Sequence, residues 1–591
     1  MKRLIKLSAL LMGITFACSC SDIKFGDDFL GTAPESNEST LDSMFSSKLN
    51  AEKVLTQAYT YLPYGLIDKL GTNQLECLTD LSSSYRENAS DGPTKLYYNG
   101  ALTANSINTN AAYCFGSEED WYTIRYAWIY IENVDRVSDM TEAEKTERKA
   151  EARMLIALSY AEMLRYIGGF PYIDHAIETT DDMSFPRLTF AESVEKIVTL
   201  IDEALPGLEW EHSDSDNGRM TRAGALGLKL RVQLFAASPM FNSDTQWHDE
   251  ADEYTCYGNY DVTRWEDALA TAEQLLEELE TNGVYELEVP ESTSTDDMRA
   301  AFRKAYYNRA SSEVLISTRR GSSVSIHDDM ITNSDYWGPT LNYVNMFPWS
   351  DGTDFSDDFD WEDPETQPFF DADGEPTRDI RLYETVAVPG DIYRDGSLAP
   401  VYSNATSGFM ESGTGFRMMK FILQQSSDRT SLLPHWPYLR LPEVYLSYAE
   451  ILNHLNGGPG RASNGDRPED YLNMVRTRLG QLPEIDTSDM DEDEFLEAVL
   501  RERALEFGYE EVRWFDLIRY GRSEDFTKTL YGLVSVGDDA RTPTSYTFST
   551  KTLTGTHART WQTNFNAKWY LAPIPQTEIN KQYGMTQNPG W

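Results

Sequence analysis

The chain has 591 residues, of which 40% are hydrophobic and 12% aromatic, so it is long enough to bury a large core. Its 96 acidic residues against 51 lysines and arginines give a formal net charge of −45, which repels nucleic acid and disfavours polyanionic ligands. Five cysteines form no disulfide framework, although a single Cys77–Cys114 bridge stays open as an alternative.

The first residues have the pattern of a bacterial lipoprotein signal. A basic start at residues 2–6 precedes an apolar run at 7–17, which is shorter than the roughly 20 residues that a membrane-spanning helix needs. Cys20 follows the small Ser19 and precedes the polar Ser21. We therefore expect cleavage before Cys20 and lipidation of Cys20. The alternatives are an ordinary signal peptide cut nearby and an uncleaved start.

A polar tether at 20–45 leads to amphipathic helices. Apolar residues recur at helical spacing, small residues line the inner faces, and a Gly-Gly stop at 168–169 ends the first clear helix. This pattern favours helix pairs of the tetratricopeptide kind, but no clean repeat period is present. The predicted helical segments are 150–169, 226–242, 264–280, 439–453 and 493–508.

Residues 285–430 have a different character, because they are rich in Gly, Asp, Pro, Ser and aromatic residues. Residues 313–320 predict a short strand, and the rest predicts an ordered, functional, irregular region. Eight acids fall within residues 351–365. A cation site is one interpretation of this stretch, but the EF-hand spacing is missing, so a solvated acidic loop is favoured.

Catalytic and metal-binding motifs are missing from the sequence. There is no HExxH, GxSxG, P-loop or strand-linked GxGxxG motif, and no two of the seven histidines have metal-ligand spacing on a helix. With so many acids, no glycosidase carboxylate pair can be singled out. We therefore predict no catalytic residue, no metal ligand and no cofactor.

Aromatic residues give the positive indication of function. The chain has 34 Tyr, 25 Phe and 13 Trp, and many fall in loop-like segments such as 84–100 and 333–352, beside Asn, Arg and Asp. Flat rings pack against the C–H faces of sugars while polar neighbours bond the hydroxyls. The alternative is that these rings fill small cores under long loops.

Several blocks, in order along the chain, resemble one family. These are residues 150–173, 218–242, 339–352, 378–386, 439–453, 501–521 and 570–591. Together with the lipoprotein start, they are similar to the SusD/RagB-like outer-membrane nutrient-binding lipoproteins of Bacteroidetes.

The resemblance implies an all-α fold: a tetratricopeptide-like superhelix of helix pairs, with a large irregular region that carries the ligand site. The implied parts are a signal peptide at 1–19, a tether at 20–45, an N-terminal helical part at 46–284, the ligand-binding region at 285–430 and a C-terminal helical part at 431–591.

The resemblance also implies a function without catalysis. The protein would be surface-exposed on the outer membrane, held there by its lipid alone, and would capture oligosaccharide or polysaccharide for a SusC-like TonB-dependent transporter. The implied glycan-binding residues, by correspondence of segments 82–101 and 325–362, are Tyr85, Arg86, Asn88, Tyr97, Tyr98, Asn99, Tyr336 and Trp337. Alternatives are a peptide or glycopeptide ligand, a surface glycoside hydrolase and a scaffold that binds only protein.

Charged residues in the block 501–521 have a structural interpretation. Glu502, Glu506, Arg513 and Asp516 lie among apolar residues, so we expect buried ion pairs that orient the last helices. The terminal Trp591 is expected to pack back onto the body.

Overall fold

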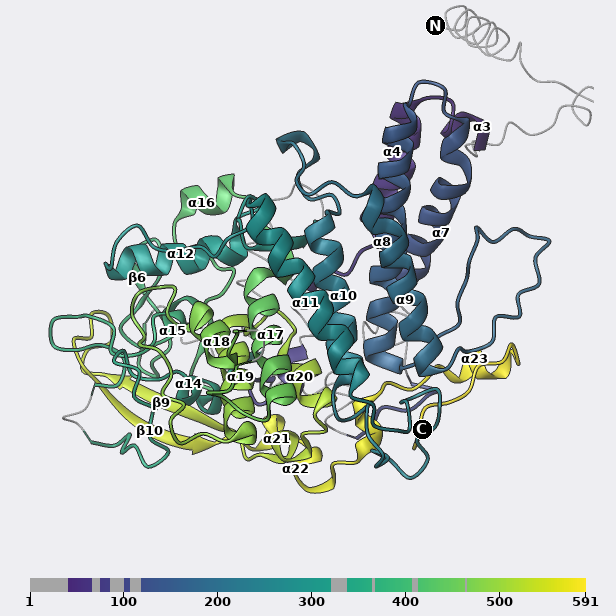
Figure 1. Ribbon diagram of the computed structural model, residues 1–591. Coiled ribbons are helices and arrows are strands. Elements are labelled where there is room, and N and C mark those ends of the chain that lie inside the picture. The colour runs from purple at the N-terminus through teal and green to yellow at the C-terminus, as the bar shows by residue number, and fades with distance from the viewer. Residues whose placement is uncertain are drawn as a thin grey trace, which may run out of the picture.

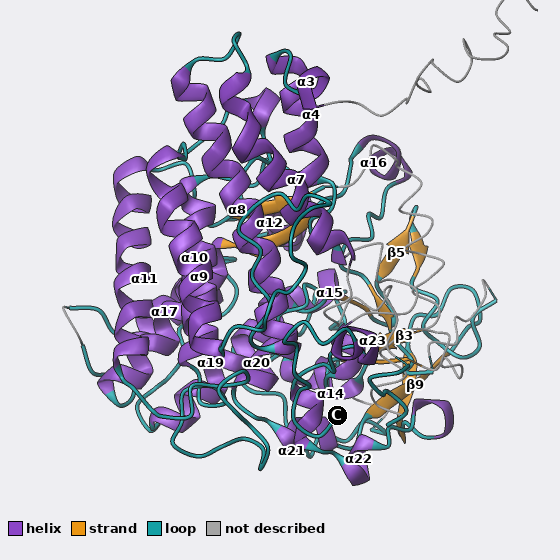
Figure 2. Ribbon diagram, turned by 90° about the vertical axis from the view of Figure 1, so that its right-hand side faces the viewer, coloured by secondary structure: helices purple, strands orange, loops and turns teal. Residues whose placement is uncertain are grey.

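The computed structural model describes residues 41–65, 75–84, 100–106, 118–319, 337–363, 367–406, 413–462 and 465–591. Long helices make up one side of the molecule, and short strands and long loops gather on the other (Figure 2). The mainly α-helical class predicted from the sequence is confirmed.

The long helices pack one against the next in chain order (Figure 1). They are α4 (Lys48–Tyr59), α7 (Glu118–Asn133), α8 (Glu142–Ile167), α9 (Phe190–Ala204), α10 (Arg222–Ala237), α11 (Thr263–Asn282), α17 (Leu441–Asn456), α18 (Pro468–Arg476) and α19 (Glu492–Phe507). Each helix contacts the next one along the chain, from α4 through α7, α8, α9 and α10 to α11. Helix α11 then contacts α17, which packs on α18 and α19. This is the expected array of tetratricopeptide-like helix pairs.

Local chemistry explains where these helices begin and how closely they pack. Capping boxes start α8, α9 and α19, where Thr141, Thr189 and Asp491 each accept from the third helical residue. On α10, Gly227 allows a close approach, because a Cβ there would lie 2.6 Å from Leu439 Cδ2. Helix α8 stops at Gly168, as predicted, with a φ of 77°.

Strands β2 (Val314–Thr318) and β8 (Trp436–Arg440) pair antiparallel against α10, which confirms the predicted strand. The hairpin of β9 (Tyr531–Gly537) and β10 (Tyr546–Thr552) was not predicted. Smaller pairs join β1 (Ser82–Ser84) to β3 (Trp337–Pro339), β4 (Val386–Ala387) to β7 (Arg417–Met418), and β5 (Ile392–Arg394) to β6 (Ser397–Leu398).

Within 285–430 the chain is more regular than expected, because α12 (Thr295–Tyr307), α14 (Leu341–Met346) and α15 (Arg381–Thr385) lie there. Other short helices are α3 (Leu41–Met44), α16 (Ser426–Ser431), α20 (Arg513–Arg519), α21 (Ser523–Thr527), α22 (Trp561–Asn564) and α23 (Gln576–Asn580). The 3-10 turns are Leu75–Leu78, Val134–Arg136, Leu205–Gly207, Asp214–Asp216, Gly555–His557 and Ala567–Tyr570.

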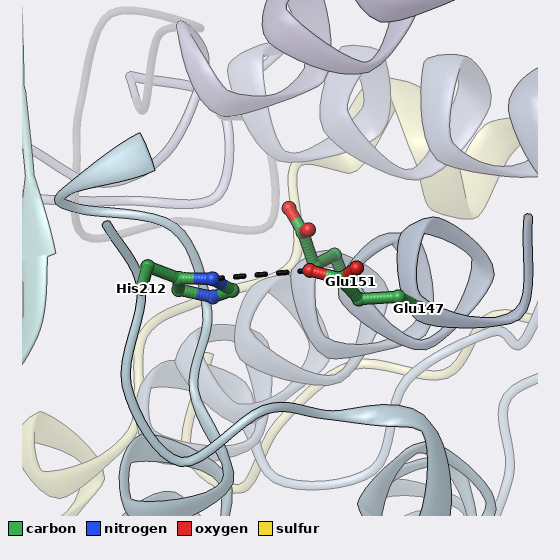
Figure 3. A group of neighbouring side chains, drawn as sticks. All are labelled: Glu147, Glu151 and His212. Atoms are coloured by element: carbon green, nitrogen blue, oxygen red, sulfur yellow. Dashed lines mark ion pairs between the residues drawn. The ribbon is translucent and has the colours of Figure 1, made fainter. Parts of the chain in front are cut away.

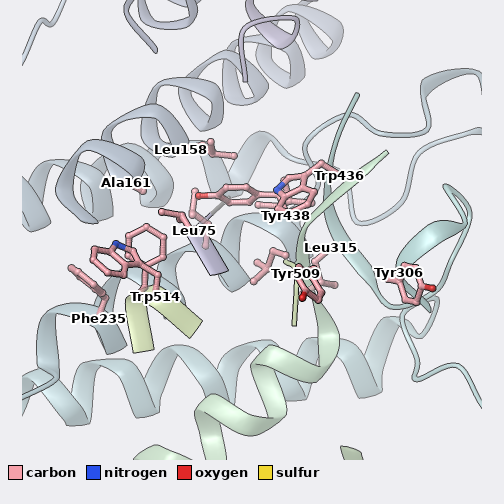
Figure 4. Packing of buried hydrophobic residues seen from close by; sticks show 14 of the residues in the cluster. Leu75, Leu158, Ala161, Phe235, Tyr306, Leu315, Trp436, Tyr438, Tyr509 and Trp514 are labelled. Atoms are coloured by element: carbon pink, nitrogen blue, oxygen red, sulfur yellow. The ribbon is translucent and has the colours of Figure 1, made fainter. Parts of the chain in front are cut away.

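One continuous apolar core joins the N-terminal helices to the C-terminal ones. Figure 4 shows Leu158 of α8 and Phe235 of α10 in this core, together with Trp514 of α20. A second, smaller cluster lies between α17, α18 and α19 and includes Leu446, Leu472 and Phe495. The helical parts predicted at 46–284 and 431–591 therefore share a core.

Buried ion pairs hold the C-terminal helices in place, as predicted. Arg440 has no exposed side-chain area and donates to Glu506, Glu510 and Glu313 at 2.7–2.9 Å. Burial alone would raise the pKa of Glu506, but Arg478 and Arg440 hold that pKa well below its usual value.

The remaining predicted pairs are present as well. Arg381 donates to Glu502 at 2.6 Å. Asp516 accepts from Arg503 and Arg519 at 2.8 and 2.9 Å. At the end of the chain, Trp591 donates to the carbonyl oxygens of Lys568 and Leu571 and therefore packs back onto the body.

Candidate functional site

Most of the predicted binding residues lie outside the described part of the chain. This holds for Tyr85, Arg86, Asn88, Tyr97, Tyr98, Asn99 and Tyr336, and also for Cys20 and Cys114. Their assigned roles stay predictions.

Trp337 is described, and the structure does not support it as an exposed platform. It starts β3, opposite Ser84 of β1, and only 2% of its surface is exposed. Its ring lies 5.5 Å from that of Tyr509, at an interplanar angle of 39°. Stacking on a sugar needs an accessible ring face, so in this conformation Trp337 belongs to the core.

The aromatic residues of segment 349–361 also pack inward. The rings of Trp349, Phe355, Phe359 and Trp361 contact one another at centroid distances of 4.7–5.9 Å. The acids Asp354, Asp357, Asp358, Asp360 and Glu362 are exposed. For this segment the structure supports a small local core under a solvated acidic loop.

A group of three tyrosines, here called the tyrosine cluster, lies on the first helix pair, where Tyr122 is exposed and Tyr61 and Tyr126 are half-buried. Tyr61 follows the end of α4, and Tyr122 and Tyr126 lie one turn apart on α7. The Tyr61 ring is 5.1 Å from Tyr122 and 6.0 Å from Tyr126, nearly parallel to the latter at 8°. Tyr122 is 42% exposed. Their hydroxyls form no hydrogen bond with any other residue that the structure describes.

The tyrosine cluster has the chemistry that neutral polyols need. Ring faces offer apolar stacking surface, and each phenol can donate one hydrogen bond and accept another. Sequence analysis missed these residues because tyrosines four apart on a helix are as typical of a core face as of a surface.

A second group, here called the acidic–histidine cluster, lies deeper in the same part of the fold. Glu147 and Glu151 stand one turn apart on α8, and His212 reaches toward them from the segment between α9 and α10 (Figure 3). His212 Nδ1 lies 3.8 Å from Glu147 Oε1. Among the described residues this is the one set of His, Cys, Asp and Glu side chains close enough to share a metal ion.

A small, partly open cavity of about 30 Å³ lies between α8, α10, α17, α19 and α20. Its lining includes Arg165, Arg231, Arg503 and Arg519, which are ion-paired with Glu162, Glu443, Asp516 and Glu450. This volume suits ordered water and excludes a sugar ring.

Within the stretches that the structure describes, no helix combines the length and the apolar character required to cross a bilayer.

Comparisons with known proteins agree with this architecture. Residues 318–591 match the model of the SusD family. A SusD-like protein from Bacteroides fragilis superposes with a TM-score of 0.71 at 21% identity, covering 94% of this chain and 100% of its own. A SusD-like carbohydrate-binding protein from the same species gives 0.65 at 20% identity, covering 91% and 99%. A laminarin-binding SusD-like protein gives 0.55 at 18%, covering 93% and 100%. No curated protein matches the sequence.

The fold is that of SusD-like proteins over nearly the whole chain, and the C-terminal part carries the family's sequence pattern. Residues 318–591 therefore resemble the SusD family in sequence, and nearly the whole chain resembles SusD-like proteins in fold.

Proposed function

We propose that this protein is a glycan-binding lipoprotein of the cell surface. It captures a neutral oligosaccharide or polysaccharide and delivers it to a SusC-like TonB-dependent transporter in the outer membrane. It does not catalyse a reaction.

The observation that carries the proposal is the tyrosine cluster. Tyr61, Tyr122 and Tyr126 bring three rings together at the surface, with hydroxyls that no described residue occupies. Folded proteins usually bury tyrosine rings or bond their hydroxyls, so a partly exposed group of this kind suits a ligand that offers both C–H faces and hydroxyls. The net charge of −45 favours a neutral ligand over an anionic one.

The relatives support the same ligand class. One solved structure of this fold is named as a carbohydrate-binding protein and another as laminarin-binding. The match of residues 318–591 to the SusD family also supports the transporter partner, and the lipoprotein pattern at Cys20 supports an anchor to the outer membrane by lipid alone.

The residues of the early loop remain part of the proposed site. Residues 66–117 connect Tyr61 to Tyr122 along the chain, so both ends of this segment are close in sequence to the tyrosine cluster. We propose that Tyr85, Arg86, Asn88, Tyr97, Tyr98, Asn99 and Tyr336 contribute further ligand contacts. The division into an N-terminal helical part, a ligand-binding region at 285–430 and a C-terminal helical part is kept as a proposal.

Affinity electrophoresis of the full-length chain in detergent against a polysaccharide panel tests the function. Retardation by one neutral glycan, without shortening of the polymer, supports capture and names the substrate. Release of reducing ends would instead show a glycoside hydrolase. If no glycan retards the protein, glycan capture is wrong, and a peptide library then tests the peptide-binding alternative.

A further inference from the structure

The acidic–histidine cluster carries more negative than positive charge. Its wider surroundings hold four carboxylates and two guanidinium groups, which are those of Glu52, Glu147, Glu151, Asp216, Arg148 and Arg219. Arg219 donates to Glu52, Glu151 and Asp216 at 2.5–2.9 Å, and Arg148 donates to Glu52 and Glu147 at 3.0 and 2.8 Å and also to Glu151.

Two negative charges are therefore left over in this group of described residues. Lys48 also interacts with Glu52, but its ammonium group is already paired with Glu144 at 2.6 Å. Glu151 has no exposed side-chain area, and Glu52 and Glu147 are 18% and 21% exposed. Asp216 is 36% exposed and reaches water, whereas the three more buried carboxylates are unfavourable without cations beside them.

The orientation of His212 is an independent observation that also indicates a cation at this place. Its side chain is only 7% exposed, and its Nε2 lies 3.0 Å from the carbonyl oxygen of Met220. A carbonyl only accepts, so Nε2 carries a hydrogen and donates it to Met220, and this bond holds the ring with Nδ1 directed at Glu147.

Nδ1 of His212 faces a carboxylate oxygen. The separation of 3.8 Å between His212 Nδ1 and Glu147 Oε1 is too long for a hydrogen bond, and no other described residue donates to Nδ1. Glu147 Oε1 accepts from Arg148 Nη1 at 2.8 Å, and the mostly buried ring nitrogen beside it is placed to share a cation with the carboxylates. Figure 3 shows the ring of His212 directed at the two glutamates of α8.

We propose that Glu147, Glu151 and His212 bind a divalent transition-metal ion of the Zn²⁺ class. One oxygen of each carboxylate and one imidazole nitrogen lie within 4.8 Å of one another. Zinc bonds to such ligands are about 2.0–2.2 Å long, so a small inward movement of the side chains closes the set. A divalent ion would also balance the two excess negative charges.

The ligand types favour Zn²⁺ over Ca²⁺. Calcium takes 6–8 oxygen ligands, whereas imidazole with two carboxylates is a zinc-type set that water can complete. The ion would link α8 to the segment between α9 and α10, beside Glu52 of α4, so its role is to brace the first helix pairs. The sequence does not reveal this set, because His212 comes from a different element than the glutamate pair.

The test uses the full-length chain in detergent, freed of metal with a chelator and then titrated with Zn²⁺ by calorimetry. We expect one equivalent to bind and the melting temperature to rise with Zn²⁺ concentration. His212→Gln and Glu147→Gln should each weaken binding at least about tenfold, because even the loss of an outer-shell partner costs about 10–100-fold in metal affinity. The control His248→Gln changes a histidine outside the cluster and should bind as the wild type does.

Cobalt provides a readout that does not depend on how the variants fold. Co²⁺ added to the wild-type chain should give visible absorption typical of a low-coordinate nitrogen and oxygen site, and Zn²⁺ should abolish it. Absence of Zn²⁺ binding overturns the proposal, as does binding that both variants retain. Detection of a protonated His212 imidazolium at neutral pH in the wild type, with no metal bound, would show that a proton fills the gap and would also overturn it.

Discussion

Arg513 of α20 forms a two-point ion pair with Asp80, which lies 433 residues earlier in the chain. The Nε–Oδ1 and Nη2–Oδ2 distances are 3.1 and 2.9 Å, and the Asp80 side chain has no exposed area. Burial alone would raise the pKa of Asp80, but the Arg513 guanidinium lowers it below its usual value. The C-terminal helices thus fix the segment that leads into the predicted glycan-binding loop.

Asp80→Asn should therefore strongly destabilise the protein. Removal of one partner leaves a buried, uncompensated guanidinium, and we expect the free energy of unfolding to fall by about 3–5 kcal/mol. Chemical denaturation followed by circular dichroism measures the change. The control is Asp354→Asn, which breaks the exposed pair with Arg501 and should have little effect. Equal losses in the two variants would contradict the role given to the buried pair.

Tyr122→Ala should weaken glycan binding and leave the fold intact. Loss of one ring from the tyrosine cluster should reduce affinity by about 1–2 kcal/mol, or roughly 5–30-fold, as for a contributing residue in a binding site. Calorimetry with the glycan found in the panel gives the value. Tyr583→Ala is the matched control, because Tyr583 is 41% exposed against 42% for Tyr122. If glycan binds but both variants bind normally, capture stands and the tyrosine cluster is not the site.

Trp337→Ala should instead lower the stability of the protein and leave glycan binding largely unchanged. Because Trp337 is 2% exposed, its truncation leaves a cavity and should lower the free energy of unfolding by about 3–5 kcal/mol. Glycan affinity per folded molecule should change little. A loss of affinity without a loss of stability would instead restore Trp337 as a ligand platform.

His435 should make stability depend on pH. Its side chain is fully buried, and burial, with repulsion from Arg319, lowers its pKa to about 3 from an unfolded value near 6.5. Between these two pH values the imidazole of His435 is protonated in the unfolded chain and neutral in the folded protein. The contribution of His435 is therefore complete above pH 6.5 and is lost as the pH falls toward 3, by up to about 1.4 kcal/mol per pH unit.

Denaturant titrations at pH 7 and pH 4.5 check this effect. His435→Gln should show a smaller loss of stability on acidification than the wild type, whatever its absolute stability at pH 7. His248→Gln serves as the control and should follow the wild type. Parallel curves for wild type and His435→Gln would refute the assigned role.

Gly415→Ala should be far more damaging than Gly258→Ala. Both glycines have left-handed backbones, with φ values of 88° and 73°. A Cβ at 415 would lie 1.8 Å from the carbonyl oxygen of Leu533 in β9, whereas a Cβ at 258 meets nothing within 4 Å. We expect about 1 kcal/mol for the strain at 258 and several kcal/mol at 415, where the backbone itself must move. Thermal denaturation compares the two variants. Similar melting temperatures would rule out the close approach of Gly415 to the Leu533 carbonyl oxygen.

Helical periodicity and caps were enough to predict the helices α8, α10, α11, α17 and α19, because the apolar spacing and the stops are local properties. The apolar setting of Glu506 and Asp516 was likewise sufficient to predict buried ion pairs, since charges survive in such a place only when paired. The hairpin β9–β10 escaped prediction, because its alternation is weak and its register depends on contacts with distant segments.

Composition and local pattern by themselves determined the helical class, the charge and the aromatic content of this protein. Only the tertiary structure decided which aromatic rings are buried and which are exposed. Trp337 and Tyr122 each follow an acidic residue and another aromatic residue in the sequence, yet the pairing of β3 with β1 buries the first, and the outer face of α7 exposes the second. The partners of a side chain across hundreds of residues, as for Arg513 and Asp80, exist only after folding.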